Sequence, residues 1–64
     1  MTIILYSMEK KTNYNEMIYG NVYQEKFSNL YWSQITNDGK TIYKNNFLTF
    51  ENAKKALKRN FKNA

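Results

Sequence analysis

The sequence predicts an α+β fold, in which a small antiparallel sheet of three to four strands packs on one carboxy-terminal α-helix. Three observations lead to it. Short runs of β-favouring residues alternate with polar stretches, an Asp38-Gly39 pair separates two of these runs, and apolar residues recur at helical spacing near the carboxy-terminal end. The 64 residues contain no linker, repeat or low-complexity block, so we expect residues 1–64 to form a single domain.

Two strands are expected in the first half of the chain. Residues 2–8 carry an apolar run, and residues 9–15 are polar enough to form a loop. Residues 16–24 then alternate, with Ile18, Gly20 and Val22 on one face. The residues on the opposite face are Met17, Tyr19, Asn21 and Tyr23. Gly20 inside a strand indicates either a bulge or the close approach of another backbone or a large ring.

A hairpin follows, made of residues 30–37, the Asp38-Gly39 turn and residues 41–44. A two-residue loop opposes Ile35 to Ile42, whereas a three-residue loop with a glycine bulge opposes Gln34 to Ile42. We favour the first register, because it pairs two β-branched side chains on one face. The order of the strands, and whether the first one lies at the edge, stay open.

The carboxy-terminal segment predicts a helix from about residue 50 to about residue 63. Thr49 is placed to cap its first amides, and Glu51 lies in the first turn, where the helix dipole favours negative charge. The apolar stripe consists of Ala53, Ala56, Leu57 and Phe61. Five basic residues lie mostly off that stripe: Lys54, Lys55, Lys58, Arg59 and Lys62.

Composition limits the chemistry. Cysteine and histidine are absent, which excludes disulfides and the usual zinc sites and removes the commonest general base and the best thiol nucleophile. The five carboxylates show no spacing of a catalytic pair, so we expect no enzymatic activity, no metal and no cofactor. No apolar segment approaches the ~20 residues that cross a bilayer, and residues 1–6 are too short for a signal peptide core, so we expect a cytoplasmic protein.

Charge and aromatic content point to a binding role. Ten Lys and Arg residues oppose five Asp and Glu, for a net charge of +5, which attracts polyanions. The helix cations are candidates to neutralise phosphates, although a lysine-rich helix that is merely solvated explains them equally well. The rings expected on the uncovered sheet face, candidates for stacking bases or contacting a protein, are Tyr19, Tyr23, Trp32 and Tyr43. Core packing of a very small protein, or a homodimer contact, would use the same rings.

Residues 31–57 resemble the arm-binding amino-terminal domains of phage and transposon integrases. The resemblance lies in an aromatic strand, a Gly-Lys turn, and Phe47, Thr49, Glu51 and Ala53 in the family's order, with Asn46 where the family has glycine. It implies a three-stranded sheet on one helix, with the sheet laid in the major groove of DNA. The chain is also similar to the small YegP-like bacterial domains, which imply no defined role.

These observations lead to the hypothesis of a small non-enzymatic protein that binds nucleic acid, or a protein that handles nucleic acid. The abundance of Asn, Lys, Tyr and Ile without proline indicates an AT-rich genome, such as that of a low-GC bacterium or its phage. The alternative is a protein-interaction module, for example a phage inhibitor of a host defence or transcription protein. A homodimer that uses the aromatic face as its interface is the third possibility.

Overall fold

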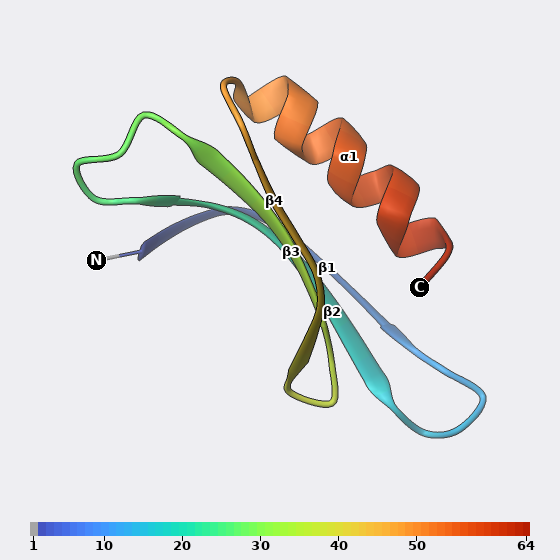
Figure 1. Ribbon diagram of the computed structural model, residues 1–64. Coiled ribbons are helices and arrows are strands. Elements are labelled where there is room, and N and C mark those ends of the chain that lie inside the picture. The colour runs from blue at the N-terminus through green and yellow to red at the C-terminus, as the bar shows by residue number, and fades with distance from the viewer. Residues whose placement is uncertain (1) are drawn as a thin grey trace.

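The computed structural model describes residues 2–64 as four strands followed by one helix. The elements are β1 (Thr2–Lys11), β2 (Met17–Glu25), β3 (Tyr31–Asn37), β4 (Lys40–Phe47) and α1 (Phe50–Lys62). All neighbouring strands pair antiparallel in the order β1-β2-β3-β4, and α1 lies on one face of the sheet (Figure 1). The predicted α+β fold is confirmed. The sheet has four strands, and β1 lies at its edge.

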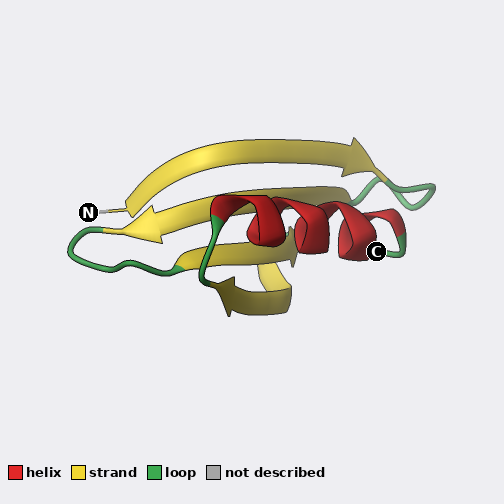
Figure 2. Ribbon diagram, turned by 90° about the horizontal axis from the view of Figure 1, so that it is seen from above, coloured by secondary structure: helices red, strands yellow, loops and turns green. Residues whose placement is uncertain are grey.

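Helix α1 packs on β2, β3 and β4, while β1 runs beside it (Figure 2). The predicted cap is confirmed, because Thr49 is extended (φ −132°, ψ 151°) and its hydroxyl accepts a hydrogen bond from the Asn52 amide at 3.2 Å. Ala53, Leu57 and Phe61 of the predicted apolar stripe are buried, so the stripe faces the sheet as its spacing predicts.

The core is formed where the sheet meets the helix. Its buried members are Ile18, Val22, Ile35, Ala53, Leu57 and Phe61. Ala56, the fourth residue of the predicted stripe, is only half-buried. Ser33 is the buried polar residue beneath the helix, and its hydroxyl donates to the Ala53 carbonyl, so β3 and α1 are joined by a hydrogen bond as well as by packing.

Gly20 lies on the face of β2 that the helix covers. A Cβ atom at this position would be 2.9 Å from Leu57 Cδ1 and 3.0 Å from Phe61 Cδ1. Of the two interpretations of this glycine, the close approach of a large ring is therefore confirmed. The missing side chain makes room for Phe61.

The β3–β4 hairpin follows the prediction at its turn but not in its register. Asp38 (φ 53°) and Gly39 (φ 84°) form a two-residue loop closed by the pair Asn37 and Lys40. Beyond it, Thr36 pairs with Thr41 but Ile35 pairs with Tyr43, which leaves Ile42 as an extra residue. The expected pairing of Ile35 with Ile42 is therefore wrong, since a bulge shifts every later residue of β4 by one position.

Strand β1 is longer than predicted. Residues 9–11, expected in a loop, continue the strand and pair with residues 17–19 of β2. An edge strand tolerates these charged side chains because one side of it faces solvent. A second irregularity leaves Leu5 unpaired between Ile4 and Tyr6.

Candidate functional site

The candidate binding residues fall into two groups, the cations of the helix and the rings expected on the uncovered face of the sheet. Ile18, Gly20 and Val22 face the helix, so alternation along β2 places Tyr19 and Tyr23 on the opposite face. The helix cations and the aromatic residues of the uncovered face therefore lie on opposite sides of the molecule. They form two surfaces, each with its own chemistry.

The first surface is the basic ridge, which we define as Lys54, Lys55, Lys58, Arg59 and Lys62. Lys54 is half-buried and the other four are exposed. The ridge borders β1, since the Tyr6 ring centroid lies 4.8 Å from Lys54 Nζ and 5.8 Å from Lys58 Nζ. Cation–π attraction at these distances orders both lysine side chains along the seam between α1 and β1.

Lys10 brings a sixth cation to this side of the sheet. Its Nζ donates a hydrogen bond to the Phe61 carbonyl at 2.8 Å and lies 4.9 Å from the Phe61 ring centroid. A cation at the last carbonyls of a helix is favoured by the helix dipole. Sequence reasoning missed Lys10 and Tyr6. Alternation with Met8 along the predicted strand would have found Tyr6, and extending that strand past Met8 would have found Lys10, because both lie on the helix side.

The second surface is the uncovered face of the sheet, which holds three of the four predicted rings. Tyr23 is only 8% exposed and stacks beside Trp32, with ring centroids 6.4 Å apart and an interplanar angle of 12°. Lys44 Nζ lies 5.0 Å from the Trp32 ring centroid. Tyr23 and Trp32 thus shield each other, whereas Tyr19 is 42% exposed and offers the most accessible ring of the three.

Tyr43 lies on the helix side, which corrects its expected place on the uncovered face. It pairs with Ile35 and packs against the core. The bulge at Ile42 is the cause, because one extra residue reverses the side to which each following side chain points. Ile42 is 50% exposed as a result.

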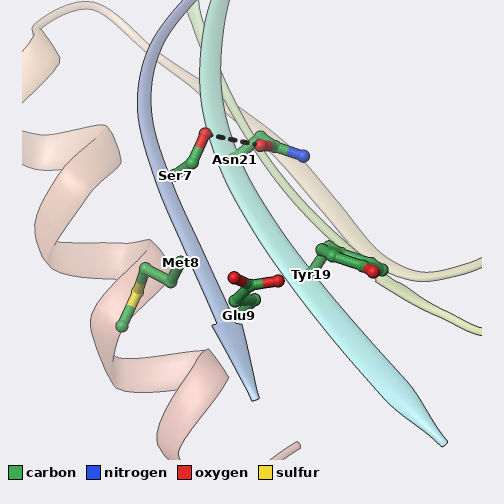
Figure 3. Close-up of a pocket in the computed structure, with 5 residues that line it drawn as sticks. All are labelled: Ser7, Met8, Glu9, Tyr19 and Asn21. Atoms are coloured by element: carbon green, nitrogen blue, oxygen red, sulfur yellow. Dashed lines mark hydrogen bonds between the residues drawn. The ribbon is translucent and has the colours of Figure 1, made fainter. Parts of the chain in front are cut away.

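A shallow hollow lies on the uncovered face between β1 and β2 (Figure 3). It encloses about 290 Å³ and is lined by Ser7, Met8, Glu9, Tyr19 and Asn21. The Ser7 hydroxyl donates to Asn21 Oδ1 at 3.0 Å. No pattern in the sequence selects Ser7, Glu9 or Asn21, because only the pairing of β1 with β2 brings them together.

Residues 2–64 contain no cluster of three or more His, Cys, Asp or Glu side chains that could hold a metal ion. Helix α1 is neither long enough nor apolar enough to cross a membrane.

Comparison of the chain with protein-family models, with curated proteins and with solved structures finds no match in any of the three. The resemblance to integrase arm-binding domains and to YegP-like domains stays a prediction.

Proposed function

We propose that this protein binds nucleic acid, with the basic ridge contacting backbone phosphates. The supporting observation is the ridge itself, in which four exposed cations occupy successive turns of one helix. No acidic residue occurs between Lys54 and Lys62, and the chain carries a net charge of +5. An ordered row of cations of this kind favours a linear polyanion.

The contacts to β1 make the ridge more suitable for binding. The Tyr6 ring restrains Lys54 and Lys58, and Lys10 ties the end of the helix to the sheet. Side chains that are already ordered lose less conformational entropy when a ligand arrives. Cations that recur about every 5.4 Å along the helix axis can each contact a different phosphate.

Binding of labelled single- and double-stranded DNA and RNA, measured by fluorescence anisotropy at several salt concentrations, tests the proposal. Neutralising four or five phosphates of a duplex gives a slope of about −4 in log affinity against log salt. Replacing Lys55→Gln together with Lys58→Gln should reduce this slope by about 2.

The matched control is Lys26→Gln together with Lys40→Gln, which removes the same charge away from the ridge. This pair should leave the slope almost unchanged. Equal losses from both pairs would mean that only net charge matters, and no binding at low salt to any of the four nucleic acids would refute the proposal.

A second candidate, a protein-interaction module such as a phage inhibitor of a host protein, is supported by the outer edge of the sheet. Ile3, Ile4 and Leu5 are 49%, 60% and 42% exposed on edge strand β1. Unpaired backbone groups next to exposed apolar side chains favour another strand or an apolar partner. Tyr23 lies on the adjacent strand β2 and stacks beside Trp32 of β3.

Purified host candidates, titrated after nuclease treatment, distinguish the two functions. Binding that is lost with Ile4→Lys but kept in the Lys55 and Lys58 double variant would favour the protein partner. Sedimentation at micromolar concentration tests the homodimer, which a strict monomer would exclude.

A further inference from the structure

We propose that the hollow between β1 and β2 is a subsite for one unpaired guanine base. The inference rests on the proposed function, because it names the base that a bound nucleic acid would place there. It is carried by three side chains that the strand pairing brings together: Glu9, Tyr19 and Asn21.

Tyr19 provides the stacking surface. It is the most exposed of the three rings on this face, and it lines the hollow directly opposite Glu9 in the pairing of β1 with β2. An aromatic side chain of this kind stacks on any base and contributes affinity without selecting one. Selection has to come from the polar groups around the ring.

The polar groups match the Watson–Crick edge of guanine. That edge offers two donors, the N1 imino group and the N2 amino group, next to one acceptor, O6. The Glu9 carboxylate supplies two acceptor oxygens, one for each of these donors. Such a charge-assisted pair of hydrogen bonds is geometrically specific and stronger than hydrogen bonds between neutral groups. Figure 3 shows this carboxylate between the two strands, with the Tyr19 side chain extending outward from β2 and Asn21 farther along β2.

Asn21 supplies the donor for O6. Its Oδ1 accepts the Ser7 hydroxyl, which leaves Nδ2 on the side away from Ser7 and free to donate (Figure 3). Adenine and cytosine each present one exocyclic donor and no donor corresponding to guanine N1–H, and uracil or thymine presents one donor between two acceptors. Guanine therefore makes the most complete set of hydrogen bonds with one carboxylate and one amide donor.

Strand β1 borders both the basic ridge and the hollow, although the two lie on opposite faces. Strand β1 is an edge strand, and its successive residues Lys10 and Lys11 point to opposite sides of it. Cations thus line both sides of this edge. A single strand that follows the ridge can cross the edge and place one base in the hollow, whereas a base within a duplex has its Watson–Crick edge occupied.

The test uses labelled thymidine decamers that carry one central guanine, hypoxanthine or adenine, with the all-thymidine decamer as reference. Hypoxanthine lacks only the N2 amino group. We expect the guanine decamer to bind about 10- to 100-fold more tightly than the adenine decamer, with hypoxanthine between them.

Glu9→Gln should abolish the preference for the guanine decamer over the adenine decamer, and Glu25→Gln is the matched control with the same charge change outside the hollow. The readout is the ratio of the two affinities, since removing any carboxylate raises the affinity for every polyanion. Tyr19→Ala should weaken binding of all four decamers.

Two results would overturn the inference, and they are distinguishable. If all decamers bind equally in a salt-dependent manner, or if Glu9→Gln keeps the guanine preference, the subsite is wrong while phosphate binding by the ridge stands. If no decamer binds at low salt, both the subsite and the proposed function fail.

Discussion

Gly20→Ala is expected to destabilise the protein, because the new methyl group has no space beneath the helix. Its Cβ would meet Leu57 Cδ1 at 2.9 Å and Phe61 Cδ1 at 3.0 Å, both shorter than an ordinary van der Waals contact. Overpacking of this kind costs about 1–3 kcal/mol. Alanine also restricts the unfolded chain more than glycine does, which stabilises the folded state by about 0.5–1 kcal/mol. Taken at the middle of both ranges, the net loss should be about 1 kcal/mol.

Urea and thermal denaturation, followed by far-ultraviolet circular dichroism, measure this loss. For a domain of this size each 1 kcal/mol lowers Tm by about 4–8 °C. Phe61→Leu removes part of the ring that the methyl group would meet, so Gly20→Ala and Phe61→Leu together should cost less than the sum of their separate effects.

A neutral or stabilising Gly20→Ala change would refute the steric reasoning. So would strict additivity with Phe61→Leu, because it would mean that the methyl group and the ring do not interact. Gly39→Ala is a useful contrast. Nothing lies within 4 Å of its Cβ position, so its cost would come from the positive φ of 84° alone and should not depend on Phe61.

Three further stability changes should be measurable by the same denaturation experiments. Ser33→Ala removes the buried hydroxyl that donates to the Ala53 carbonyl and should cost about 1 kcal/mol, whereas no loss would mean that this bond contributes nothing net. Lys10→Met keeps the aliphatic stem but loses the hydrogen bond to the Phe61 carbonyl, and should cost about 1–2 kcal/mol. An unchanged denaturation midpoint would contradict this. Thr49→Ala removes the helix cap and should cost about 1 kcal/mol, with Thr49→Ser, which keeps the hydroxyl, expected to retain most of the stability.

Local signals in the sequence determined much of this fold. The cap at Thr49, the Asp38-Gly39 turn and the buried face of α1 were all predictable, because each depends on side-chain chemistry and periodicity within a few residues. The five cations of the basic ridge were predictable for the same reason. Gly20 was recognised as special, but which of its two interpretations held depended on where Phe61 lies.

Only the tertiary structure decided the rest, since strand pairing joins residues that are distant in the chain. The bulge at Ile42 places Tyr43 on the helix side, and no local pattern in β4 predicts this bulge. The pairing of β1 with β2 placed Glu9 opposite Tyr19. Composition and periodicity therefore determined which chemical groups this protein presents, while register and layering, which depend on contacts between distant segments, decided which of those groups share a surface.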